Sequence, residues 1–298
     1  MDGSSGVSAA SAGRGEASTR SAQKAPRIKV RAMGFPFRDA GIPRHWFMGS
    51  PHLTHLSNAL QLLFPAGERF FIRSVKHYED RISDPELKAR IKGFYGQEGR
   101  HGHEHERLFK VLEAQGYEIE SFLAWYEDMA YEKLEKRFSP AMRLSVTAAL
   151  EHFTAAMGRN ALTSDFLDEA HPIIAELMRW HAAEEIEHKS VAFDVFKAVD
   201  GRYHVRVAGL FLALVGLTRF WSEGTKHFLR EEAKMGTDLK AAAKAARENP
   251  RLQLERKRRG QMFRDAILEY LRPGFHPDDI DDYELARAYL ESIGRLDG

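Results

Sequence analysis

The 298-residue sequence contains no cysteine. Disulfide bonds, cysteine nucleophiles, zinc fingers and cysteine-ligated iron–sulfur clusters are therefore all excluded. A metal ion in this protein must be held by His, Asp or Glu side chains, of which the chain has 14 His and 43 acidic residues. Hydrophobic residues make up 43% of the chain, which is enough to build a sizeable buried core.

An excess of charge of one sign is also absent, because 44 Lys and Arg residues oppose 43 Asp and Glu residues and leave a net charge of +1. A chain without a strong overall field is not expected to recruit nucleic acid. The sequence also lacks an apolar run of about 18 residues and the apolar central segment of a secretory signal. We therefore predict a cytoplasmic protein with no nucleic-acid partner.

Composition divides the chain into four predicted parts. Residues 1–27 are rich in Ser, Gly and Ala and predict a disordered tail. Residues 28–51 are broken by Gly and Pro and predict an irregular lead-in, with one short strand at Ile28–Met33. Residues 52–200 place apolar side chains at helical spacing and predict a helical bundle. Residues 201–298 predict a C-terminal helical extension that packs on this bundle.

The predicted bundle consists of four long helices, most of which start at a capping residue followed by proline. Their approximate ranges are His52–His77, Pro85–Gln115, Pro140–Leu162 and Pro172–Val199. An additional helix over Ile119–Lys136 occupies the connection between the second and third. The predicted fold class is therefore all-α, a four-helix bundle with an extra helix in one connection and further helices at the C-terminus.

An apolar run at Val207–Leu217 stands out in the C-terminal part, flanked by Arg206 and Arg219. It is too short to span a bilayer by itself. One interpretation is a buried helix that packs on the bundle. The other is an exposed helix that contacts a membrane surface peripherally or forms a homodimer face.

The four predicted bundle helices carry acidic residues and histidines in a regular pattern. The first and third helices each contain a single acidic residue, and the second and fourth each contain a Glu-x-x-His pair: Glu68, Glu151, Glu98 with His101, and Glu185 with His188. A carboxylate on an apolar helix face costs several kcal/mol or shifts its pKa unless it has a partner. Residues three apart share a helix face, so these six side chains predict a buried site for two metal ions.

His181 lies on the same stripe of the fourth helix as Glu185 and His188 and is a seventh predicted ligand. Carboxylates combined with imidazoles suit iron or manganese. We expect His105, one turn beyond His101, to lie outside the ligand set. The remaining acidic residues near the pattern are expected to face solvent, namely Glu104, Glu106, Glu184 and Glu187.

A structural alternative needs no metal. Glu68 or Glu151, taken singly, could form a buried ion pair with an arginine. The candidate partners are Arg69, Arg73 and Arg143.

The ligand pattern is similar to that of ferritin-like dimetal carboxylate bundles. Longer blocks of the chain resemble the bacterial family of predicted metal-dependent hydrolases. These blocks are His45-Trp46-Phe47, Thr54-His55, Phe64-Pro65-Ala66-Gly67-Glu68-Arg69-Phe70-Phe71, Gln97-Glu98 with His101, Trp180-His181 with Glu184-Glu185 and Glu187-His188-Lys189, and Arg272-Pro273-Gly274-Phe275-His276-Pro277. The resemblance extends from about Ile28 to Leu285 and implies a metal-dependent activity.

The ligand set, including the extra histidine, is also similar to that of the di-iron arylamine N-oxygenases. This resemblance implies two iron ions and a division of the ligands between them. Glu68 and His101 would hold one iron, Glu151, His181 and His188 the other, and Glu98 and Glu185 would bridge both. Because the similarity is confined to the ligands, the aromatic amine substrates of those enzymes do not carry over.

These observations predict a di-iron carboxylate enzyme that activates O2 to oxidise a small organic substrate. No dinucleotide-binding Gly-x-Gly-x-x-Gly motif follows a strand, so electrons would come from an external donor or from the substrate. Two alternatives stay open. One is a hydrolase in which metal ions, zinc included, activate water. The other is a non-catalytic metal-binding or membrane-associated protein.

Overall fold

The computed structural model describes residues 25–297, and this part of the chain is helical without a named strand. The all-α prediction is confirmed. The predicted strand at Ile28–Met33 is wrong, because this segment has no regular secondary structure and forms no ladder with any other part of residues 25–297. An isolated bridge joins Phe47 to Ala170 instead. The predicted tail at residues 1–27 lies, up to residue 24, outside the described residues.

Four helices form the centre of the molecule: α1 (Pro51–Lys76), α2 (Pro85–Ala114), α4 (Pro140–Thr163) and α5 (Pro172–His188). Each has proline in its first turn, where a missing N–H costs nothing. The side chains of Ser50, Asp84 and Ser139 accept hydrogen bonds from backbone N–H groups in the first turns of α1, α2 and α4. These starts agree closely with those predicted from the sequence.

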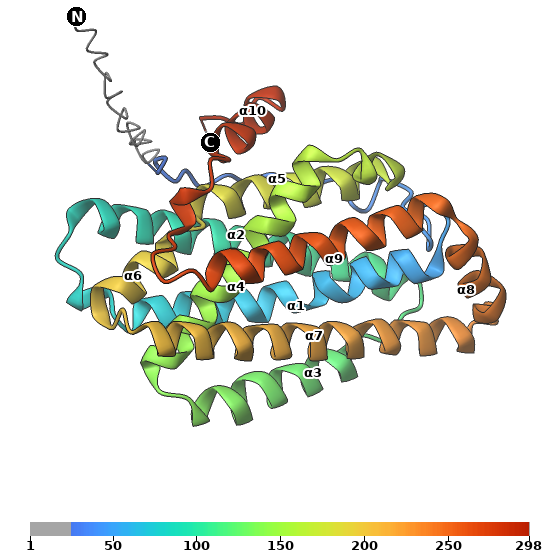
Figure 1. Ribbon diagram of the computed structural model, residues 1–298. Helices are drawn as coiled ribbons and strands as arrows, with labels where there is room; N and C mark the ends of the chain where they lie inside the picture. Colours follow the sequence, from blue (N-terminus) through green and yellow to red (C-terminus); the bar gives the residue numbers. More distant parts are fainter. Residues whose placement is uncertain (1–24, 298) are drawn as a thin grey trace, which may run out of the picture.

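The same four helices enclose a common interior. α1 packs on α2, α2 on α5, α5 on α4, and α4 on α1, so the contacts close into a ring (Figure 1). Side chains that point inward from any of the four helices therefore meet one another. This arrangement positions the candidate site.

The fourth predicted helix differs from the expectation, because it is broken in two. α5 ends at His188, and α6 (Val191–Val199) follows after the turn at Lys189 and Ser190. In this turn the buried Lys189 ammonium donates hydrogen bonds to Asp282 and to the backbone oxygen of Ile280. A buried ammonium needs such acceptors, so the break is tied to the packing of the C-terminal segment.

The predicted extra helix in the connection is present but irregular. α3 (Glu120–Glu127) continues into a π-helical stretch at Asp128–Leu134 and a short 3-10 turn at Glu135–Arg137. π-Helical turns are rare and occur frequently at functional sites. Here the stretch contributes Ala130, Tyr131 and Leu134 to the wall of a cavity.

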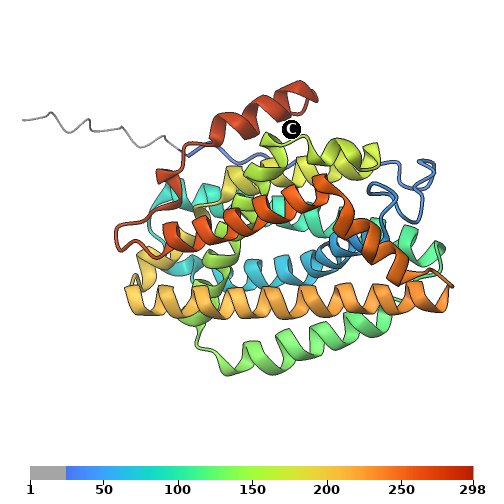
Figure 2. The same ribbon diagram turned by 45° about the vertical axis from the view of Figure 1, so that its right-hand side comes forward.

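The C-terminal part consists of α7 (Tyr203–Lys234), α8 (Leu239–Glu248), α9 (Pro250–Tyr270) and α10 (Tyr283–Ser292). α7 packs along α1 and α4, α9 packs on α4, and α10 packs on α5. Figures 1 and 2 show α7 with α3 on one side of the molecule and α10 on the opposite side. The boundary expected near residue 200 stays a prediction.

The apolar run at Val207–Leu217 is part of α7 and is longer than the sequence pattern suggested. By length and composition α7 could cross a membrane, since an 18-residue window has a mean hydropathy of 1.4. In the structure 28% of that window is buried, and Phe211 and Val215 are 55% and 66% exposed. Both the membrane contact and the homodimer contact stay predictions.

Gly209 and Gly216, two turns apart on α7, give a matched test of the α4–α7 contact. A Cβ on Gly209 would lie 2.7 Å from the Cβ and 2.8 Å from the carbonyl carbon of Ser145, whereas one on Gly216 meets nothing within 4 Å. Gly209→Ala should lower the free energy of unfolding by about 1–3 kcal/mol through overpacking. Gly216→Ala should raise it by about 0.5–1 kcal/mol through helix propensity. Urea denaturation measures both, and equal effects would contradict the close approach.

Candidate metal centre

All seven ligands predicted from the sequence lie together in the interior. α1 contributes Glu68, α2 contributes Glu98 and His101, α4 contributes Glu151, and α5 contributes His181, Glu185 and His188. None is more than 4% exposed. They form overlapping groups of three in which the candidate donor atoms lie within 4.8 Å of one another.

The atoms that face the centre of this cluster lack hydrogen bonds. Within residues 25–297, no hydrogen-bond partner exists for either carboxylate oxygen of Glu68, Glu98 and Glu151, for Glu185 Oε2, His101 Nδ1 or His188 Nε2. An unsatisfied buried polar group is costly, and native proteins rarely contain many. Since these atoms are carboxyl oxygens and imidazole nitrogens that lie close together, the donor set fits metal ions.

Glu185 is placed to contact both halves of the cluster. Its Oε1 lies 2.8 Å from His181 Nε2 and 3.7 Å from His101 Nδ1, and its Oε2 lies 3.5 Å from His188 Nε2. Glu98 also belongs to two groups, one with Glu68 and His101 and the other with Glu151 and His188. The bridging positions implied for Glu98 and Glu185 are thus compatible with the geometry.

His181 lies in the other half of the ligand cluster from the one that the resemblance implied. The similarity to the arylamine N-oxygenases grouped His181 with Glu151 and His188. In the structure His181 Nε2 instead lies 3.7 Å from Glu68 Oε1, and its ring stacks on that of His101 with centroids 4.0 Å apart. The reason is helical rise, because positions seven apart are separated by about 10 Å along α5. His181 and His188 therefore point to opposite ends of the cluster.

The second nitrogen of each histidine ligand is engaged on the outside. His101 Nε2 lies 3.0 Å from Glu184, His188 Nδ1 lies 2.9 Å from Gln97 Oε1, and His181 Nδ1 lies 2.7 Å from His105 Nε2. Such contacts hold an imidazole in one orientation and leave its other nitrogen available to a metal. His105 also forms a group of possible donors with Glu68 and His181, so its place outside the ligand set stays a prediction.

A buried arginine that sequence reasoning missed completes this outer layer. Arg31 is 1% exposed and donates hydrogen bonds to Glu184 at 2.9 Å and to Glu187 at 2.7 and 3.0 Å. Gln97 in turn donates to Glu187 at 2.7 Å. Arg31 comes from the irregular lead-in, where no periodic pattern marks it.

The expectation that Glu104, Glu184 and Glu187 face solvent is therefore wrong, since they are 4%, 0% and 6% exposed. Glu106 faces solvent as predicted. The sequence did contain a signal of this burial. Acidic residues lie on several sides of α5, which also carries the apolar Trp180 and Ile186, and acids on a buried helix require a cation from another part of the chain.

The alternative of simple ion pairs with three nearby arginines is also wrong. Arg69 pairs with Glu106 and Glu127, and Arg73 and Arg143 both approach Glu135. These guanidinium groups neutralise peripheral carboxylates. Glu68 and Glu151 are left without them.

Burial and mutual repulsion raise the pKa of Glu68, Glu98 and Glu151 well above the usual carboxyl range. Burial also lowers the pKa of His101 and His105, and the neighbouring His181 adds to this effect. His101 is therefore neutral, as a metal ligand must be, whereas these three carboxyl groups need a cation to become ionised.

Another His and Glu cluster, at Glu232 on α7, differs in that its carboxylate is fully engaged. His45 Nε2 and His55 Nε2 lie 3.2 and 3.1 Å from it, Arg44 donates at 3.0 Å, and Tyr117 also donates. The arginine supplies the positive charge that a metal would otherwise bring. This cluster ties the lead-in and α1 to α7.

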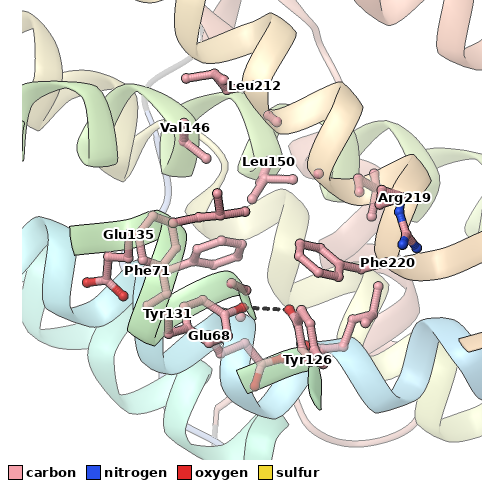
Figure 3. Close-up of a pocket in the computed structure, with 18 of the residues that line it drawn as sticks. Glu68, Phe71, Tyr126, Tyr131, Glu135, Val146, Leu150, Leu212, Arg219 and Phe220 are labelled. Carbon is pink, nitrogen blue, oxygen red and sulfur yellow. Dashed lines mark hydrogen bonds between the residues drawn. The ribbon is translucent and has the colours of Figure 1, made fainter. Parts of the chain in front are cut away.

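An apolar cavity of about 360 Å³ borders the cluster at Glu68. Figure 3 shows Phe71 and Phe220 facing each other across it, with the hydrogen-bonded Tyr126 and Tyr131 near Glu68. A separate cavity of about 90 Å³ is lined by His105, His181 and Glu185. Four residues line both cavities, namely Leu60, Phe64, Thr154 and Met157.

Comparison with known proteins gives one match. The model of a family described as predicted metal-dependent hydrolase matches residues 29–281. No curated protein and no solved structure matches the chain. The matched region includes Arg31 and all seven candidate ligands.

Arg31 should be required both for stability and for metal affinity. Arg31→Ala leaves Glu184 and Glu187 buried without a cation, which should lower the free energy of unfolding by about 3–5 kcal/mol. It also loosens His101 and His188 and should weaken metal binding by about 10- to 100-fold. Denaturation and metal titration measure the two effects. The exposed Arg38 in the same lead-in is the control, and similar losses for Arg38→Ala would contradict this role.

The metal-free protein should become less stable as the pH rises above about 7, where unfolded histidine is already neutral. The raised pKa values of Glu68, Glu98 and Glu151 mean that the folded state holds protons that the unfolded state has lost. Each such proton lowers the free energy of unfolding by about 1.4 kcal/mol per pH unit. Urea denaturation between about pH 7 and 9 tests this. In metal-loaded protein the free energy of unfolding should not fall over this pH range. An equal fall with and without metal would contradict metal binding at these carboxylates.

Proposed function

The chain belongs to the family of predicted metal-dependent hydrolases, and on this basis we propose that its buried cluster holds two metal ions within a ferritin-like four-helix bundle. The observation that carries the proposal is the set of unpartnered oxygen and nitrogen atoms that converge between α1, α2, α4 and α5. Four carboxylates balance the charge of two divalent ions, because the imidazoles are neutral. Iron is the metal that we assign, with manganese as the nearest substitute.

The geometry suggests a division of the ligands between the two ions. Glu68, His101 and His181 would hold one ion and Glu151 and His188 the other, with Glu98 and Glu185 shared. One half then has two histidines and lies at the side of His105 and the 90 Å³ cavity. At roughly 30 Å³ per water molecule, that cavity has room for O2 or a few waters.

We further propose that the reaction is an oxidation by O2 of an apolar organic substrate, since two ferrous ions held by these ligands would supply electrons to O2. The support is the composition of the larger cavity, whose wall near Glu68 is aliphatic and aromatic. Insertion of one oxygen atom into a C–H bond releases the other atom as water. This balance requires two electrons and two protons from an external reductant, such as a reduced flavin or iron–sulfur protein.

Within this cavity the chain positions the substrate and excludes water. Phe71, Phe220 and Leu150 enclose the space beside Glu68 (Figure 3). The hydroxyls of Tyr126 and Tyr131 are 2.5 Å apart, and burial raises the pKa of both, so they hold their protons. This uncharged pair is placed to exchange a hydrogen bond with a hydroxyl group that the reaction forms on the substrate beside Glu68.

Hydrolysis is the second candidate, and the family description favours it. It would use water activated by the metals and would need no electrons. A hydrolase must also bind the polar group that it cleaves. In the wall of the larger cavity, Tyr126, Tyr131 and Thr154 supply the uncharged hydroxyls for this task.

The test begins with protein produced in iron-supplemented medium, which is analysed for metal, reduced without oxygen and then exposed to O2. We expect about two irons per chain and a change in the visible spectrum on exposure to O2. Glu151→Gln should reduce the iron content, while the exposed Glu106→Gln should not.

The outcomes separate the candidates. Bound zinc, no response to O2 and turnover of a long-chain ester would establish hydrolysis in place of oxidation. Equal iron loading in the Glu151 and Glu106 variants would contradict the assigned site. Metal loading without either activity would indicate a binding role.

A further inference from the structure

The apolar cavity beside Glu68 opens at the outer face of α7. Val215 and Arg219, one turn apart on α7, both line it, and their side chains are largely exposed. At its other end the cavity is lined by Glu68, which is 2% exposed. The space therefore leads from the surface of α7 to a side chain of the candidate metal centre.

The size and lining of the cavity suit a single hydrocarbon chain. At roughly 30 Å³ for a group the size of water or methylene, about 360 Å³ holds on the order of 12 such groups. The wall near Glu68 includes Phe64, Phe71 and Leu150, with the hydroxyls of Tyr126, Tyr131 and Thr154 as its uncharged polar groups. Glu135 and Arg143, which also line the cavity, approach each other to 3.8 Å. A bulky or highly polar molecule would lose hydration there without compensation.

A polar groove of about 310 Å³ adjoins the mouth of this cavity and shares Arg219 with it. Its wall also contains Arg230, His227 and Glu223, with the aromatic side chains Phe122 and Trp125. Glu223 is already paired with Arg219 at 3.0 Å and with Lys226 at 2.9 Å. Cationic groups thus outnumber the acidic group, and the groove favours an anion.

We propose that the substrate is a single-chain amphiphile with an anionic head group, such as a long-chain fatty acid. The head binds in the groove between Arg219 and Arg230, and the hydrocarbon chain passes Val215 into the cavity. This placement brings methylene groups of the chain, and not the head group, beside Glu68. The inference rests on the proposed function, because it names the substrate class of the same site.

Binding of dodecanoate to the metal-loaded full chain, measured by calorimetry, tests the proposal. Gly216 lines the cavity and has open space beside its Cα, so Gly216→Trp should fill the cavity and weaken binding by at least about tenfold. Gly260 on α9 is the matched control, since it also has open space but does not line the cavity. Leu212→Trp, from the neighbouring turn of α7, fills the same cavity if the first variant is unstable.

The role of the head group is tested by reversing the charge at Arg219 and by comparing an acid with an alcohol. Arg219→Glu should weaken dodecanoate binding by about fivefold and leave dodecanol binding unchanged, because an exposed ion pair contributes modestly. Equal losses for the acid and the alcohol would contradict the groove assignment. Dodecanoate binding that is absent, or that survives both tryptophan variants, would overturn the proposal.

Metal content is measured in the same samples, which keeps two kinds of failure apart. Normal metal loading without dodecanoate binding would refute the substrate class and leave the metal centre intact. Absence of metal in the unaltered protein would refute the proposed function itself.

Discussion

Four carboxylates and three imidazoles share one buried interior, and this constraint governs the rest of the structure. Glu68, Glu98, Glu151 and Glu185 are all nearly inaccessible to solvent. Carboxyl groups this close together cannot all be ionised in a low-dielectric core without a cation. The four central helices close into a ring around the cluster, so that each carboxylate faces the others and not the solvent. The bundle is therefore built around a place for positive charge.

A second layer of buried charge keeps the first in position. The Arg31 guanidinium joins Glu184 and Glu187, and these reach His101 directly and His188 through Gln97. The cost of burying these groups is offset only while all are present, because each satisfies the hydrogen bonds of the next. The irregular lead-in is thereby as necessary to the site as the helices, although it contributes no ligand.

The two sides of the cluster differ in chemistry. Toward Arg31 the surroundings are polar and already hydrogen-bonded, whereas toward α7 and the π-helical stretch they are apolar and open. This asymmetry separates a region that fixes the ligands from a region that can receive a substrate. The irregular turn at Asp128–Leu134 matters because it places Tyr131 beside Tyr126 over the part of α1 that carries Glu68.

The sequence by itself determined the helical class, the starts of the four central helices and the seven candidate ligands, because capping residues, helical spacing and isolated acids such as Glu68 and Glu151 act locally along one helix. It could not break the fourth helix at Lys189 or bury Glu184 and Glu187. Those outcomes depend on contacts with Arg31 and Asp282, far away in the chain. Only the tertiary structure decided them, because a buried charge is tolerated where a distant partner neutralises it and periodicity carries no record of that partner.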